Sequence, residues 1–222
     1  MNLRTLSLTA AALSLLAGAS VASAQALPSD LDATSRARVP YLVRKDAAPD
    51  SKRLWDTFVR NSNSPTDTLR GPLAFSSYNA PVGIALLDLH DGAVGKSSSL
   101  DAHVRELAIL VACRATNYSF EFNGHEAAAV KAGVDQKVID IVRTNGALTG
   151  ISDADAAVIR FGREILNDRK VSSATFAKVK QLYGDKGAMD LVAVMSTYAV
   201  SGFYAIAVDE HVDKMLPPVA AH

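Results

Sequence analysis

The stretch RELAILVACRATNYSFEFNGHEAAAVKAG, residues 105–133, decides the fold class of this chain. Its first half holds the unbroken apolar run Leu107–Cys113, which is typical of a helix buried on most sides. Its second half reads as a helix from Tyr118 to Ala132 and meets Gly133, a residue that commonly ends helices. Because only a short turn joins the two segments, we expect two helices that pack against each other.

The flanking segments extend the helical pattern in both directions. Ser98 or Ser99 is a suitable cap for the buried helix, which should run to about Thr116. Further helices are expected over residues 51–61, 73–89 with a break or kink at Pro81, 135–143, 152–166, 172–183 and 191–208. No segment alternates polar and apolar residues as a half-buried strand does. The sequence therefore predicts an all-α fold.

The segment Leu191–Val208 contains 18 residues without a charge, which is long enough to cross a membrane. It also contains hydroxyl groups, for example at Ser196, Thr197 and Ser201, and it follows several amphipathic helices. We therefore interpret it as a buried central helix or as an interface between subunits.

Residues 1–24 have the three parts of a bacterial secretory signal: Arg4, the apolar stretch Leu6–Val21, and the cleavage sequence Ala22-Ser23-Ala24. Cleavage there predicts a periplasmic or secreted protein without stable membrane insertion; an uncleaved membrane anchor is the alternative. Residues 25–50 are rich in Pro, Asp and Ser and should form an irregular arm. Residues 51–216 should form one helical domain.

Composition limits the functions that the chain can have. The 222 residues include 23 basic and 23 acidic side chains, so no excess positive charge is present to neutralise nucleic-acid phosphates. The single cysteine excludes an intramolecular disulfide and a zinc site built from several cysteines.

Three side chains near the centre of the chain suggest acid–base chemistry. Glu106 stands at the start of the apolar helix, where an ionised carboxylate needs a partner. Glu121 and His125 are four residues apart and so lie on one face of the next helix. If the two helices pack together, two carboxyl groups and one imidazole meet in an apolar site, as proton transfer near neutral pH requires. The alternatives are a solvated ion pair and a metal site that includes His103.

The stretch 105–133 also resembles the core motif of the carboxymuconolactone decarboxylase family, which includes alkyl hydroperoxidase D. The resemblance extends back to Gly71-Pro72 and forward through SDADAAVIRFGREIL, residues 152–166, to DEHVD, residues 209–213. It implies an alkyl hydroperoxidase D-like helical bundle that assembles as a homotrimer or homohexamer.

The family's hydroperoxidase branch combines a Cys-x-x-Cys pair with a proton relay of one glutamate and one histidine. By this resemblance the relay residues fall on Glu106 and His125, whereas the cysteine positions fall on Tyr118 and Glu121. Without a thiolate, nothing attacks a peroxide bond. Cys113 lies inside the apolar run, where a thiol is usually buried and inert.

The decarboxylase branch fits better, because it carries a glutamate and a histidine at the positions of Glu121 and His125. The resemblance then implies a lyase or isomerase that needs no metal or organic cofactor and acts on a small carboxylated lactone or unsaturated acid. His125 would be the acid or base, Glu121 its proton partner and Glu106 the group that orients the imidazole.

Other residues are expected at the substrate. Arg114, or alternatively Arg105, would meet a substrate carboxylate, and Tyr118 would donate a hydrogen bond. Two other functions stay open: a peroxide-defence protein that uses Cys113, and a non-catalytic module that binds a small hydrophobic acid.

Overall fold

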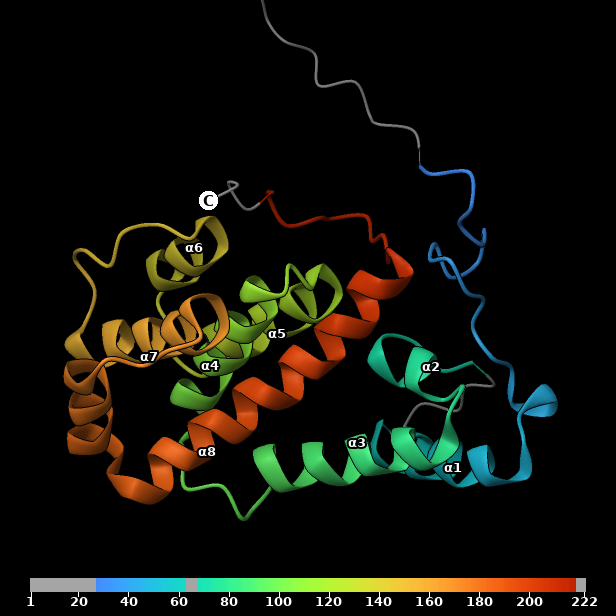
Figure 1. Cartoon of the computed structure of the whole chain (residues 1–222), viewed down its shortest axis with the longest axis horizontal. Coiled ribbons are helices and arrows are strands. Elements are labelled where there is room, and N and C mark those ends of the chain that lie inside the picture. Colours follow the sequence, from blue (N-terminus) through green and yellow to red (C-terminus); the bar gives the residue numbers. More distant parts are fainter. Residues whose placement is uncertain (1–26, 63–67, 219–222) are drawn as a thin grey trace, which may run out of the picture.

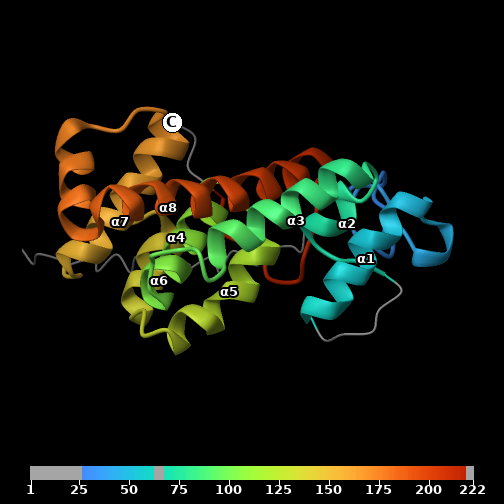
Figure 2. The ribbon, with the colours of Figure 1, turned by 90° about the horizontal axis from the view of Figure 1, so that it is seen from below.

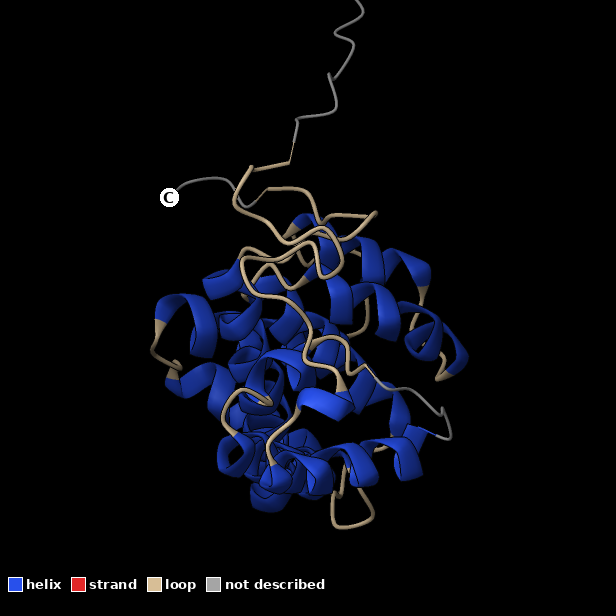
Figure 3. Cartoon of the chain, turned by 90° about the vertical axis from the view of Figure 1, so that its right-hand side faces the viewer, coloured by secondary structure: helices blue, strands red, loops and turns tan. Residues whose placement is uncertain are grey.

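The computed structural model describes residues 27–62 and 68–218, in which the one feature of a sheet is an isolated bridge between Val43 and Thr68. This confirms the all-α fold class (Figure 3). The predicted signal segment lies outside the described residues, so export stays a prediction. The helices are α1 (Pro49–Ser62), α2 (Pro72–Ser76), α3 (Ala80–Val94), α4 (Ala102–Ala115), α5 (Ser119–Lys131), α6 (Gln136–Thr144), α7 (Asp153–Arg163) and α8 (Ser173–Val208), with a 3-10 turn η1 (Arg44–Asp46) and a π-helical turn η2 (Glu164–Asp168).

Helix α4 forms the centre of the larger group of helices. It packs against α5, α6, α7 and α8, as the two views of the ribbon show (Figures 1 and 2). No residue of the run Leu107–Cys113 is more than 3% exposed, which confirms that this helix is buried on most sides. The apolar run therefore builds the core and holds the helices that carry the site.

A smaller hydrophobic cluster joins α1, α2 and α3. It contains Leu54, Trp55, Leu69, Ala74 and Leu87, all at least 93% buried. Helix α8 crosses α4 and α7 and also contacts α2 and α3, so it connects this cluster to the larger group (Figure 1).

The element α8 consists of two helices that meet at Gly184, as the sequence predicts. Gly184 has a φ of 69°, which only glycine adopts easily, and it interrupts the helical geometry between Ser173 and Val208. The second helix begins before the expected Leu191. By length and composition α8 could cross a membrane, but it packs on α4, α7 and α3, and its most apolar window is 44% buried. These contacts agree with a central helix. Its exposed apolar side chains Met189, Phe203 and Ile206 leave the interface role as a prediction.

One local prediction was wrong, and one is made more exact. The cap of α4 is Asp101, whose carboxylate accepts a hydrogen bond from the Val104 amide at 2.8 Å; Ser99 instead binds Asp190. Pro81 does not kink a longer helix but lies in the first turn of α3, where its missing N–H costs no hydrogen bond. Of the break or kink expected at Pro81, the structure has the break, which separates α2 from α3.

The segments before α1 and after α8 lie against each other. The amide of Arg38 donates to the carbonyl of Val208, and the amide of His211 donates to the carbonyl of Arg36. Further along, the amide of Leu216 donates to the hydroxyl of Ser119 at the start of α5. These bonds fix the C-terminal segment beside α5.

The close crossing of α4 and α8 predicts a large cost for added bulk. A Cβ at Gly202 would collide with the side chain of Thr116, whereas a Cβ at Gly92 in α3 would meet nothing within 4 Å. We expect Gly202→Ala to lower the free energy of unfolding by about 1–3 kcal/mol. The control Gly92→Ala should raise it by about 0.5–1 kcal/mol through helix propensity. Urea denaturation measures both, and equal stability of the two variants would contradict this packing.

Candidate active site

His125 lies between two carboxylates, as the sequence predicts. Its Nδ1 is 2.8 Å from Glu106 Oε2, and its Nε2 is 3.2 Å from Glu121 Oε2. Glu106 comes from the second turn of α4, while Glu121 and His125 share one face of α5. Asn117, with φ of 52°, turns the chain between the two helices and brings these faces together. The spacing and the helix hairpin together thus assemble the cluster.

The cluster is largely screened from water. The side chains of His125, Glu106 and Glu121 are 24%, 13% and 18% exposed. Burial alone would lower the pKa of the imidazole, but the hydrogen bonds and charges of Glu106 and Glu121 outweigh it and raise the pKa of His125 to about 9. His125 is therefore a cation at neutral pH, held at both nitrogens.

Tyr198 completes the contacts of the imidazole and was not foreseen from the sequence. Its hydroxyl lies 3.1 Å from His125 Nε2, and its ring meets the imidazole edge-on at 5.1 Å between centroids. The same hydroxyl is 3.5 Å from Nε2 of His90 on α3. Because Tyr198 is 73 residues away from His125 on α8, no local spacing could have indicated this contact.

Glu210, just after α8, adds a third carboxyl group near the cluster. Both of its carboxylate oxygens are buried without a hydrogen-bond partner. Burial and the negative charge of Glu121 raise the pKa of Glu210 to about 7, so this carboxyl group binds a proton at a higher pH than an ordinary glutamate does. The DEHVD segment contained this residue, but only the fold of the C-terminal segment brings it near α5.

Tyr118, predicted to bind substrate, is 1% exposed, and its hydroxyl is buried without a hydrogen-bond partner. Burial and the charges of Glu121 and Glu210 raise the pKa of Tyr118 well above its ordinary value. The hydroxyl therefore stays protonated in the neighbourhood of these two carboxyl groups.

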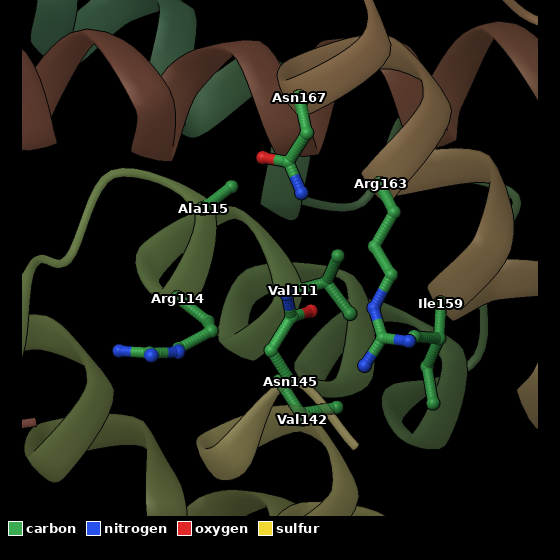
Figure 4. A pocket seen from close by; sticks show the side chains of 8 residues that line it. All are labelled: Val111, Arg114, Ala115, Val142, Asn145, Ile159, Arg163 and Asn167. Atoms are coloured by element: carbon green, nitrogen blue, oxygen red, sulfur yellow. The ribbon is translucent and has the colours of Figure 1, made fainter. Parts of the chain in front are cut away.

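Arg114, also predicted to bind substrate, is not brought to the cluster. Its Nη1 donates to Asn117 Oδ1 at 3.0 Å and to the carbonyl of Pro217 at 2.8 Å. Arg114 follows Glu106 by eight residues on α4, which places it about 12 Å further along the helix. It borders a cavity of about 20 Å³, large enough for about one water, and its guanidinium points away from the other side chains labelled in Figure 4. Arg114 ties the C-terminal segment to α4.

Arg105 is the alternative cation. Among the residues that the structure describes, Arg105 has no ion-pair partner, and its charge acts on the hydroxyl of Tyr198. The positive charge of Arg105 therefore acts on a residue that contacts His125, and among the described residues no ion pair competes with a ligand carboxylate for it.

Cys113 lies beneath the cluster, fully buried. Burial, followed by the negative charges of Glu121 and Glu106, raises the pKa of Cys113 well above its ordinary value. The thiol is therefore protonated and shielded from solvent, which is the reverse of what a reactive cysteine needs.

His103, considered as a metal ligand, is placed elsewhere. Its Nε2 contacts Asp155 Oδ1 at 2.7 Å, and Asp155 also accepts a hydrogen bond from Ser152, the cap of α7. Within residues 27–62 and 68–218, no group of three His, Cys, Asp or Glu side chains has the arrangement to hold a metal ion.

The fold is shared with alkylhydroperoxidase-like proteins of known structure. The alkylhydroperoxidase AhpD core protein from Ralstonia eutropha JMP134 aligns with a TM-score of 0.62 and 18% identity, over 79% of this chain and 91% of that chain. A peroxidase-related protein from Silicibacter sp. TM1040 aligns with a TM-score of 0.60 and 15% identity, over 82% of this chain and 93% of that chain. The debrominase Bmp8, solved as a cysteine variant with 2,3,4-tribromopyrrole, aligns with a TM-score of 0.59 and 12% identity, over 79% of this chain and 91% of that chain. The predicted alkyl hydroperoxidase D-like fold is thus confirmed.

Residues 81–164, from α3 to the start of η2, match the sequence profile of the Carboxymuconolactone decarboxylase family. This segment, which includes Glu106, Glu121 and His125, is therefore similar to that family, in agreement with the resemblance found in the sequence. No curated protein gave a significant match to the chain.

Proposed function

We propose that the protein is a cofactor-free lyase or isomerase that acts on a small carboxylated lactone or a similar unsaturated acid. The observation that carries this proposal is the imidazole of His125, held at Nδ1 by Glu106 and at Nε2 by Glu121 and Tyr198. A proton donor fixed at both nitrogens in a largely dry site has the geometry of a general acid.

In the proposed reaction, breaking of the bond to the carboxylate releases CO₂ and leaves the bonding electron pair on the conjugated substrate. The Nε2 proton of His125 then moves to the substrate carbon, and the imidazole becomes neutral. Glu106 keeps the Nδ1 proton in place and so fixes the ring orientation, while Glu121 stabilises the cationic form before transfer. Water supplies the proton that restores His125.

Charge balance supports Arg105 as the group that meets the substrate carboxylate. The cluster contains three carboxyl groups near one imidazolium, so an anionic substrate needs a further cation. Arg105 has no competing ion pair among the described residues, whereas Arg114 is held by Asn117 and Pro217. We therefore assign carboxylate binding to Arg105 rather than to Arg114.

The proposed enzyme acts outside the cytoplasm. The charged start, the apolar stretch and the Ala22-Ser23-Ala24 sequence support this part of the proposal. An exported member of the family would meet substrates that enter from the surroundings.

The proposal is tested with purified protein that begins at Gln25, incubated with a panel of lactones and carboxylated enol-lactones and analysed by mass spectrometry. We expect at least one compound to lose CO₂ or to isomerise, and Cys113→Ser to retain that activity because the thiol is buried. Binding without any product would support a non-catalytic module instead. Peroxide consumption that Cys113→Ser abolishes would support the peroxide-defence function and overturn the proposal.

A further inference from the structure

The hydroxyl of Tyr198 connects the buried imidazole of His125 to a second histidine at the surface. It lies 3.1 Å from His125 Nε2 and 3.5 Å from His90 Nε2. Tyr198 is 4% exposed, whereas the side chain of His90 is 46% exposed. We propose that Tyr198 and His90 form a proton path that links His125 to solvent.

The contacts form a chain of hydrogen bonds in which the cationic His125 donates on both sides. Nδ1–H of His125 donates to Glu106, and Nε2–H of His125 donates to the oxygen of Tyr198. The hydroxyl of Tyr198 donates to Nε2 of His90, and Nδ1–H of His90 donates to Asp91, 3.3 Å away. Each donor in this arrangement meets an acceptor, so the chain is complete from the buried carboxylate to the surface.

The site needs such a path because His125 and both of its carboxylate partners are largely buried. After His125 has given its Nε2 proton to a substrate, its Nε2 becomes an acceptor, and the Tyr198 hydroxyl turns from His90 to donate to it. A His90 that has bound a second proton then donates its Nε2–H to the Tyr198 oxygen. The Tyr198 proton moves to His125 Nε2 as the His90 proton moves to the Tyr198 oxygen. His90 becomes neutral and regains a proton from water or buffer at its exposed ring, so no charge is left on Tyr198.

The surroundings of Tyr198 require that the two transfers occur together. Burial, together with the charges of Glu121 and Glu106, raises the pKa of Tyr198 above its ordinary value, and only Arg105 opposes this. A free tyrosinate is therefore unfavourable, and the hydroxyl can pass a proton only by receiving another. Asp91 is the charged group that contacts His90 on its other side.

The path is tested without a substrate, by the rate at which the imidazole protons of His125 exchange with water. Nuclear magnetic resonance of protein with ¹⁵N-labelled histidine measures this rate in the wild type, Tyr198→Phe and His90→Gln. We expect both variants to slow the exchange by about tenfold or more, because each removes one link of the relay. Tyr204→Phe, on the same helix, is the matched control and should leave the rate unchanged.

Added imidazole separates a proton path from a purely structural contact. In His90→Gln it should restore the exchange rate, because free imidazole can deliver protons to Tyr198; in Tyr198→Phe it should not. Exchange in His90→Gln within about twofold of the wild type would overturn the path, since exchange through direct water access would then dominate.

The role of this path in turnover rests on the proposed function, but the exchange measurement does not. If exchange slows in both variants while His125→Gln retains activity, the path stands and the proposed acid–base role fails. If His125→Gln is inactive while exchange is unchanged, the proposed function stands and the path fails.

Discussion

The substitution His125→Gln is expected to lower kcat by about a hundredfold to ten-thousandfold on the substrate that the panel identifies, because it removes the proton donor. Glutamine keeps a hydrogen-bonding side chain between Glu106 and Glu121, but its amide is too weak an acid and too weak a base to act as a proton donor near neutral pH. Steady-state kinetics measure the effect, and circular dichroism checks that the helices are retained.

Glu126→Gln is the matched control on the same helix. Glu126 pairs with Arg143 and Lys214 rather than with His125, so this variant should change kcat by less than about threefold. A His125→Gln protein with more than half of the wild-type kcat would show that the imidazole does not carry the chemistry.

The second large effect is a loss of stability as the pH rises. The folded-state pKa of His125, about 9, lies above the ordinary value of 6.5, so the protonated form favours folding. This contribution is fully present below about pH 6.5 and is lost as the pH rises through about 9. The upper bound of this contribution is on the order of 3 kcal/mol, because each unit by which the folded-state pKa exceeds the ordinary pKa corresponds to about 1.4 kcal/mol.

The raised pKa of Glu210 also lowers the stability of the fold as the pH rises, over a lower pH range than that of His125. Its folded-state pKa of about 7 exceeds the ordinary 4.5, so its contribution is present below about pH 4.5 and is lost as the pH rises through about 7. Urea denaturation between pH 5 and 10 measures how the free energy of unfolding depends on pH. Compared with the wild type, this dependence should be weaker above pH 6.5 in His125→Gln and weaker below pH 6.5 in Glu210→Gln. The same pH dependence of the free energy of unfolding in the wild type and both variants would contradict the raised pKa values of His125 and Glu210.

The central helices and the acid–base cluster could be predicted from the sequence because both depend on local spacing. The run Leu107–Cys113 requires a buried helix, and the four-residue spacing places Glu121 and His125 on one face. The short turn at Asn117 then leaves few ways for α4 and α5 to pack. Glu106 meets His125 as a direct consequence.

The remaining groups could not be predicted because they depend on contacts between distant segments. Tyr198 meets His125 and His90 only because α8 crosses α4 and α3. Glu210 comes near Glu121 only because the C-terminal segment lies beside α5. Arg114 was misplaced for the same reason: its partner Pro217 is 103 residues away. Resemblance to a family indicates which residues align with known site residues. It does not show which polar side chains already form hydrogen bonds to distant parts of the chain.

The measurement that tests the central claim most directly is the titration of His125 by nuclear magnetic resonance in the wild type, Glu106→Gln and Glu121→Gln. The pKa of His125 should be near 9 in the wild type and lower in each variant, because each variant removes one charge and weakens one hydrogen bond. A wild-type pKa near 6.5 that neither substitution changes would contradict an imidazole held between these two carboxylates.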